Sequence, residues 1–363
     1  MKAEDVRTAA DAKQIVDERK LTHVKVAVFD IDGILRGKYM ARDKFFGALD
    51  KGFGFCDVVL GWDSNDQLYD NVRYTGWHTG YPDAPVRILP ETCRDIPFEP
   101  GMLLFLAEFV EDGEAICPRG VLRRVVEQAR RMGFEPFAGL EYEYFVFDET
   151  PDSVRAKRFR DMKPMAPGFF GYSMIRNSVH SDHYLETLDL CEKMRFPLEG
   201  LHEETGPGVL EAAIAVDAAV SAADKAGLFK TFIKVHAQRR GRMATFMAKW
   251  SPDYPGQSGH IHVSLKDLNG GAVFHDPRDA YGMSALMKHF VAGQQALMPE
   301  LLSMLGAHQR DLGRRKPHLR AAGDTGFGEE PAGRIPHCVR RCQPLPRAGG
   351  GAGFRPVGHR AQT

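Results

Sequence analysis

The chain has 363 residues, 43% of them hydrophobic, with 48 basic and 48 acidic side chains and a formal net charge of zero. This composition predicts a globular protein of one or two domains and excludes an electrostatic footprint for nucleic acid or acidic membranes. No apolar run reaches about 18 residues and no signal-peptide pattern opens the chain, so we expect no membrane span. Six widely spaced cysteines form no disulfide framework, which fits a reducing cytoplasm.

The first part of the chain alternates short apolar runs with turn-forming residues. Residues 3–18 predict a short helix, and Val24–Phe29 predicts a strand that stops at the turn Asp30–Gly33. Further strand-like runs follow at Phe53–Leu60, Val86–Leu89 and Met102–Phe109. A boundary at Glu111–Gly113 gives a small sheet-rich N-terminal domain over residues 1–111.

The next part, residues 112–305, predicts longer elements. Pro118 opens a helix that runs to about Met132 and stops at Gly133. Phe137–Phe147 is predicted to be a long strand. Further helices are expected at 181–195, 216–238 and 282–305, and further strands near 209–215, 242–249 and 259–265. The pattern therefore predicts an α+β fold whose larger second domain contains helices and mostly antiparallel strands.

Two glutamates share one face of the long strand. Alternate residues of a strand point the same way, so Glu141 and Glu143 lie together while Tyr142 and Tyr144 point to the other face. Two carboxylates inside an apolar strand repel each other and are costly to desolvate. Either that face is open to water, the commoner arrangement for an isolated pair, or cations neutralise it.

Two further features favour cations. His202-Glu203 precedes Glu211 across a turn-forming Thr-Gly-Pro-Gly, so two strands joined by this turn can bring Glu203 and Glu211 together. After a Gly-rich loop, His260 and His262 share another strand face. Carboxylates with a single histidine suit Mg²⁺ or Mn²⁺ better than structural Zn²⁺, which prefers cysteine and histidine. The sequence therefore indicates a site for divalent cations.

In this order, Glu-x-Glu, His-Glu-x7-Glu and Gly-rich-loop-His-x-His resemble the glutamine synthetase family over residues 20–305. The segment Asp30–Lys38 resembles the opening of the family's β-grasp domain, as worded in its γ-glutamylpolyamine synthetase-type branch. The resemblance implies an ATP-dependent ligase that phosphorylates the γ-carboxylate of glutamate and joins it to ammonia or an amine. It also implies Mg²⁺ or Mn²⁺, ATP as co-substrate, and homo-oligomeric rings with active sites between subunits.

The resemblance implies a role for each matching carboxylate. Glu143, Glu203 and Glu211 match the family's ligands of one metal ion. Glu141 and His260 match two of the three ligands of the other. One metal site is thus expected to have all its protein ligands, and the second to lack one.

Other matches concern the substrates. His262 and Ser264 fall where the family contacts the nucleotide, and Gly256 lies on the family's glutamate-binding loop. Asp63, in Gly-Trp-Asp-Ser, stands where the family carries an aspartate that a neighbouring subunit contributes to deprotonate ammonium, although the usual Phe-Asp-Gly-Ser-Ser is absent. Asp63 and Glu211 are therefore the candidate catalytic residues.

A phosphatase is a rival interpretation of the first strand. Its end, Asp30-x-Asp32-Gly, also matches the first motif of haloacid-dehalogenase-type phosphatases, in which the first aspartate is the nucleophile. That class needs a doubly wound sheet and a later Gly-Asp motif, whose sole counterpart is Gly323-Asp324. The middle of the chain lacks the alternation of strands and helices that a doubly wound sheet needs, so we rank the phosphatase below the ligase.

Residues 306–363 depart from the family pattern. They hold eleven Lys and Arg against four Asp and Glu, and they lack the family's substrate arginines, lid glutamate and last metal ligand. Yet allowed codons for Arg310–Leu319, read one base further on, encode the family-like string Ala-Thr-Trp-Gly-Val-Glu-Asn-Arg-Thr. Glu329–Arg341 and Arg340–Gln362 shift into family strings in the same way.

A deletion and frameshift after Leu305 would explain this segment, and it predicts a nearly inactive chain. Such a chain is either a weakened ligase or a remnant that binds metal and ATP or assembles with homologues. The alternative is an irregular, disordered basic tail, for which the Gly, Arg and Pro content is typical.

Overall fold

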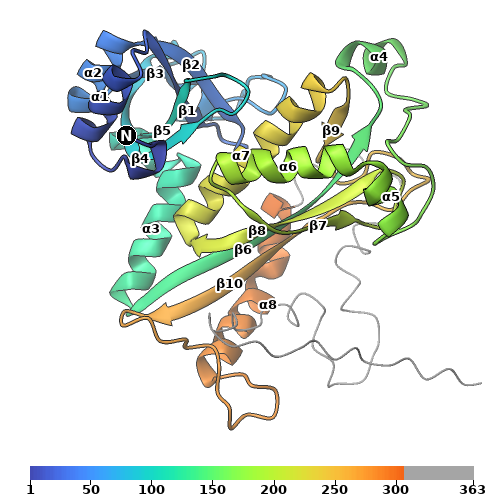
Figure 1. Ribbon diagram of the computed structural model, residues 1–363. Coiled ribbons are helices and arrows are strands. Elements are labelled where there is room, and N and C mark those ends of the chain that lie inside the picture. Colours follow the sequence, from blue (N-terminus) through green and yellow to red (C-terminus); the bar gives the residue numbers. More distant parts are fainter. Residues whose placement is uncertain (306–363) are drawn as a thin grey trace, which may run out of the picture.

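The computed structural model describes residues 1–305, and the predicted frameshifted tail lies outside the described residues. Two five-stranded sheets and their helices confirm the predicted α+β class (Figure 1). One sheet is built from residues before the predicted boundary and the other from residues after it. The β-grasp assignment of the first part stays a prediction.

The first sheet has the strand order β2-β1-β5-β4-β3, in which only β1 and β5 are parallel neighbours. Its strands are β1 (His23–Phe29), β2 (Leu35–Ala41), β3 (Phe53–Cys56), β4 (Asp83–Asp95) and β5 (Leu103–Phe109). The predicted strand at 53–60 ends early, because Asp57–Leu60 form a 3₁₀ turn. The sequence analysis did not predict β2 or the helix that follows it, α2 (Arg42–Lys51).

The outer face of the first sheet is covered by α1 (Ala9–Glu18) and α2. Ile15 of α1 and Phe45 of α2 are fully buried against Phe105 of the central strand. The expected helix at 3–18 is divided into a 3₁₀ turn at Ala3–Asp5 and the helix α1. Thr8 lies between them and caps α1, because its side chain accepts a hydrogen bond from the backbone N–H of Asp11.

The second sheet has the order β10-β6-β8-β7, with β9 also paired to β6, and all its strand pairs are antiparallel, where the sequence predicted mostly antiparallel ones. Its strands are β6 (Phe134–Phe147), β7 (Leu198–Glu203), β8 (Val209–Ala218), β9 (Met243–Thr245) and β10 (Gly259–Asp267). The helices of this part are α3 (Pro118–Arg131), α4 (Pro151–Ala156), α5 (Met174–Val179), α6 (Ser181–Lys193), α7 (Ala219–Arg239) and α8 (Ala285–Leu305). Helices α6 and α7 cover one face of the sheet (Figure 1).

One hydrophobic core joins the two sheets through α7. Phe29 and Leu106 of the first sheet belong to the same buried cluster as Tyr144 of β6 and Phe229 of α7. The approach is close at Gly227, where a Cβ atom would lie 2.4 Å from Cε1 of Phe29. Glycine at this position therefore lets the first sheet pack directly on the helix that supports the second.

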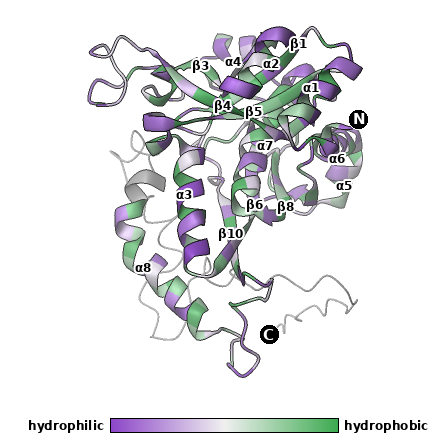
Figure 2. Cartoon of the chain, turned by 90° about the vertical axis from the view of Figure 1, so that its left-hand side faces the viewer, coloured by the Kyte–Doolittle hydropathy of each residue, from purple (hydrophilic) through white to green (hydrophobic). Residues whose placement is uncertain are grey.

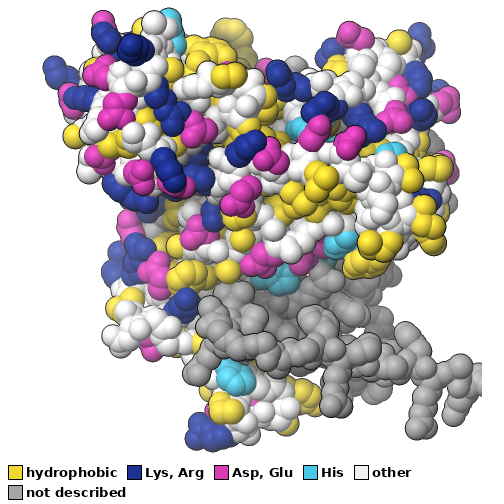
Figure 3. Space-filling view, viewed as in Figure 1, with side chains coloured by type: hydrophobic (Ala, Val, Ile, Leu, Met, Phe, Trp, Pro, Cys, Tyr) yellow, Lys and Arg dark blue, Asp and Glu magenta, His cyan; other side chains and the backbone are white. Residues whose placement is uncertain are grey.

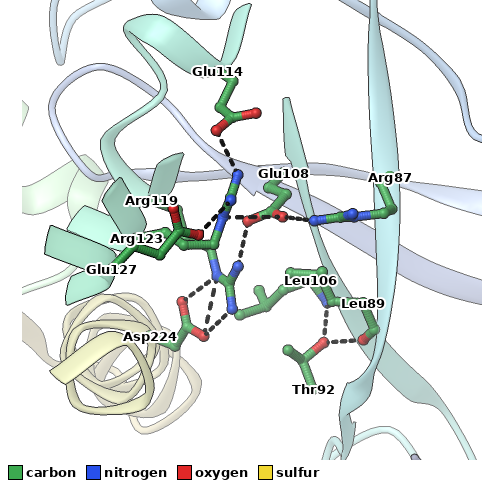
Figure 4. A network of polar contacts seen from close by, with 10 residues as sticks. All are labelled: Arg87, Leu89, Thr92, Leu106, Glu108, Glu114, Arg119, Arg123, Glu127 and Asp224. Atoms are coloured by element: carbon green, nitrogen blue, oxygen red, sulfur yellow. Dashed lines mark hydrogen bonds and ion pairs between the residues drawn. The ribbon is translucent and has the colours of Figure 1, made fainter. Parts of the chain in front are cut away.

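Ion pairs cross the same boundary. Arg119 of α3 bonds Glu108 of β5, and its Nε lies 3.1 Å from Oδ1 of Asp224 on α7 (Figure 4). Burial raises the pKa of Glu108, but Arg119, Arg87 and Arg123 outweigh it and hold that pKa below its usual value. For Asp224 burial prevails, so its pKa is raised despite Arg119. Arg119 thus joins three elements from both sides of the predicted boundary.

The longer helices differ in their distribution of polar residues. Hydrophilic residues dominate the visible side of α3, whereas α8 mixes both kinds (Figure 2). Among the described residues, no helix combines the length and the apolar character that crossing a membrane requires.

Candidate metal site

The predicted carboxylates and histidines meet on the face of the second sheet opposite α6 and α7. Glu143 of β6 pairs with Glu211 of β8, which pairs with His202 of β7, and Glu141 pairs with His260 of β10. Residues paired across neighbouring strands share a face. The register therefore places these side chains on one face, and acidic and histidine side chains adjoin beneath the sheet in Figure 3.

The tightest group consists of His202, Glu204 and Glu211, which can offer three ligand atoms within 4.8 Å of one another. Nε2 of His202 lies 3.4 Å from Oε1 of Glu204 and 3.4 Å from Oε2 of Glu211. The hydrogen bond to Glu211 is the main cause that raises the pKa of His202 above its usual value. Carboxylate oxygens with an imidazole are a donor set that suits a divalent cation.

Glu143 borders this group. The backbone N–H of Ser258 donates to its Oε2 at 2.8 Å. Burial raises the pKa of Glu143, and the nearby carboxylates of Glu211 and Glu204 raise it further, against the opposing hydrogen bond from Ser258. Half-buried like charges of this kind are relieved by a cation, so the donor set fits a divalent metal ion.

The structure does not place Glu203 in this group, which corrects the predicted ligand set. Glu203 pairs with Leu210 and points to the core face, where it is 3% exposed and lies 3.8 Å from Nη1 of Arg176. The next residue, Glu204, lies beside Glu211 instead. Strand alternation is the physical reason for Glu203: because His202 faces Glu211, the next residue of β7 faces away. Glu204 follows the end of β7 and lies with His202 and Glu211 again. This parity follows from the register between β7 and β8, which pairs His202 with Glu211.

The second predicted pair lies along β6 and β10. Glu141 is opposite His260, and Oε1 of Glu141 lies 3.2 Å from Nε2 of His262. His262 was predicted to contact a nucleotide, which stays a prediction, and in the structure it contacts Glu141, a predicted metal ligand. Ser264 is buried on the same face, two residues further along β10.

Gly256 lies in a loop that is fixed against β6. A Cβ atom on Gly256 would lie 2.8 Å from the backbone oxygen of Ala248. The Gln257 amide donates to the backbone oxygens of Thr245 and Met247, at 3.0 and 2.7 Å. These contacts replace sheet pairing, so β9 is only three residues long and the predicted strand at 242–249 is wrong in extent. The loop delivers the Ser258 N–H to Glu143.

Asp63 lies elsewhere, in a turn of the first part of the chain. Its Oδ1 accepts the backbone N–H groups of Asn65 and Gln67, at 2.8 and 2.9 Å. No contact joins it to the carboxylates of the second sheet within the described residues. Its predicted catalytic role would therefore have to be exerted on another subunit.

Asp30 closes the turn between β1 and β2. It is fully buried, its Oδ1 accepts the N–H groups of Asp32 and Ile34, and its Oδ2 accepts Nε of Arg36 at 2.7 Å. A phosphatase nucleophile needs an oxygen open to substrate on a doubly wound sheet. Asp30 has neither, so the phosphatase interpretation does not fit.

The fold and the carboxylate-rich face describe an α+β protein with a candidate site for divalent cations. A family model described as "Glutamine synthetase, catalytic domain" matches residues 115–330, more than half of the chain. The chain belongs to the glutamine synthetase family. The match extends past Leu305, after which the sequence analysis placed the loss of the family pattern.

Known proteins agree with this assignment. The chain is 46% identical over 287 residues to Type-1 glutamine synthetase 2 of Dictyostelium discoideum, covering 78% of this chain and 55% of that protein. It is 31% identical over 335 residues to a glutamate–isopropylamine ligase of a Pseudomonas species, covering 90% and 72%. A solved GmaS/ADP complex has the same fold, with a TM-score of 0.68 at 20% identity over 81% of this chain and 64% of that one.

Proposed function

We propose that this chain is a metal-dependent ligase that uses ATP to join the γ-carboxyl group of glutamate to ammonia or an amine. The observation that carries the proposal is the single sheet face that holds Glu141, Glu143, Glu204 and Glu211. Family membership supplies the reaction class, and the similarity to an isopropylamine ligase supports an amine as the acceptor.

Two ligand groups follow from the geometry. Glu143, Glu204 and Glu211 would hold one divalent cation, with His202 beside them, and Glu141 and His260 would contribute to a second. Bound Mg²⁺ or Mn²⁺ would neutralise charge on the transferring phosphoryl group. The protein itself fixes the carboxylates: the Ser258 N–H orients Glu143, and strand pairing holds Glu211 opposite it.

The substrates would surround this face. The Gly256 loop would border the glutamate site, and His262 and Ser264 would contact ATP, as the resemblance implies. Asp63 would act on a neighbouring subunit in a homo-oligomeric ring.

The first test is Mn²⁺ titration by calorimetry in Glu204→Gln. The variant should bind Mn²⁺ at least about tenfold more weakly, because it loses a ligand. Glu199→Gln is a matched control, since Glu199 is an exposed residue of β7, the strand that ends just before Glu204, and it should bind like the wild type. Equal Mn²⁺ affinity in Glu204→Gln and wild type would overturn the ligand assignment.

The second test separates ligase from remnant. ATP binding and γ-glutamyl transfer to hydroxylamine are measured on the same Mn²⁺-loaded protein. Transfer activity supports the ligase. Metal and ATP binding without transfer supports the inactive remnant, which the sequence of residues 306–363 favours because it lacks the substrate arginines.

A further inference from the structure

The side chain of Tyr172 covers one side of the metal group, by which we mean the candidate ligand cluster His202, Glu204 and Glu211. The ring of Tyr172 stacks on the imidazole of His202, with centroids 4.4 Å apart and planes 9° from parallel. Because Nε2 of His202 faces Glu204 and Glu211, the stack restricts the plane of the ring that contacts both carboxylates. Tyr172 has a φ of 56°, a left-handed conformation that L side chains rarely adopt. Such strain persists only where the surroundings hold it.

Arg176 holds the loop that carries Tyr172. Its guanidinium donates to the backbone oxygens of Pro167 and Gly168, the latter at 3.1 Å, and lies over the ring of Phe170. One planar fork thus binds the beginning of the loop. The backbone N–H of Arg176 is itself fixed by Oγ of Ser173, the residue that caps α5.

Glu203, the carboxylate that faces away from the metal group, holds the end of the loop at Tyr172. Its Oε2 lies 3.8 Å from Nη1 of Arg176, and its backbone oxygen accepts the N–H of Tyr172 at 2.8 Å. Arg176 is the only cation that the described residues place within ion-pair distance of this buried carboxylate. Glu203 therefore fixes the loop twice, through its backbone and through Arg176.

We propose that Arg176 is a positioning residue, which through Glu203 and the loop 167–172 keeps Tyr172 stacked on His202 and so orients the imidazole of the metal group. The inference rests on the proposed function only where it concerns metal binding. The chain of contacts runs from Arg176 to the loop, from Tyr172 to His202, and from His202 to Glu204 and Glu211.

The first measurement needs no metal. The measurement is the NMR chemical shift of the His202 ring protons in protein with labelled histidines. These shifts depend on the stacked ring of Tyr172, and Tyr172→Ala gives their values without the stack. Arg176→Met should move them toward those values, and Arg176→Lys should restore part of the shift, because lysine keeps the charge but not the fork. Unchanged His202 resonances in Arg176→Met would overturn the proposal.

The second measurement is Mn²⁺ affinity. Arg176→Met should weaken it about tenfold, as is typical when a group that orients a ligand is lost. Arg160→Met is the control, since Arg160 is exposed and its side chain has no ion pair in the described structure. Urea midpoints are recorded for both variants. A lower midpoint with unchanged affinity would show a merely structural role and contradict the proposal.

The two proposals fail in different ways. If the wild-type protein binds no Mn²⁺, the proposed ligase function fails, and the His202 resonances still decide whether Arg176 positions Tyr172. If the wild type binds Mn²⁺ and Arg176→Met binds it equally well, the positioning role fails and the ligase stands.

Discussion

Replacing Arg119 by methionine would remove the cation that joins the two parts of the molecule. The side chains of Glu108 and Asp224 are only 1% and 6% exposed, so the variant would leave two buried carboxylates short of their partner. Removing one partner of a buried ion pair typically costs about 3–5 kcal/mol. Glu108 keeps its bond from Arg87, which places the expected loss of unfolding free energy near the lower end, at about 3 kcal/mol.

The loss should depend on pH. Arg119 now lowers the pKa of Asp224 against a larger effect of burial, so without Arg119 that pKa rises further. A carboxyl group whose pKa is raised in the folded state stabilises the fold below its unfolded value and loses that stability as pH rises through the folded value. Arg119→Met should therefore cost more at pH 8 than at pH 5.

Urea unfolding followed by circular dichroism and tryptophan fluorescence measures this cost. Arg131→Met is a matched control on the same helix, because Arg131 is exposed and its side chain bonds only Gln128 within residues 1–305, and it should change stability by less than about 0.5 kcal/mol. Adding Asp224→Asn to Arg119→Met should recover part of the loss. A cost below about 1 kcal/mol, or one equal at both pH values, would refute the reasoning.

Three further changes test other parts of the structure. Burial, and to a smaller extent the charge of His236, lowers the pKa of His183 to about 3, so the stability present above the unfolded pKa of about 6.5 is lost as pH falls. His183→Leu should therefore reduce the loss of stability between pH 7 and pH 5. Urea midpoints measure this loss, with His289→Gln, at an exposed histidine, as the control. Gly227→Ala should cost about 1–3 kcal/mol, and less beside Phe29→Leu, because its methyl group would meet the Phe29 ring; equal costs in the two backgrounds would contradict this. Asp30→Asn should lower the unfolding free energy by about 1–3 kcal/mol through its bond with Arg36, yet leave Mn²⁺ affinity unchanged in calorimetry.

Local periodicity predicted the side chains that share a face within one strand. Glu141 with Glu143, and His260 with His262, lie as alternation requires. The prediction for Glu203 was wrong because it depended on the register between two strands, which the spacing of residues alone does not determine.

Other features have only weak local signals. Strand β2 has Arg36, Gly37 and Lys38 in succession and only one buried residue, and Gly37 packs where a Cβ would lie 2.7 Å from the Val26 oxygen, so its sequence does not resemble a strand. Arg119 and Asp224 are 105 positions apart, and nothing in either segment indicates the other.

The shared core around Phe29, Leu106 and Phe229 determines how the molecule could be divided. A cut in the short segment after β5 would fall between two sheets but would open an apolar surface on each fragment. Neither fragment should persist alone, whereas the two together should reassemble without a covalent link. The molecule is therefore suited to fragment complementation, in which recovery of Mn²⁺ binding by the second fragment would report that the first has docked.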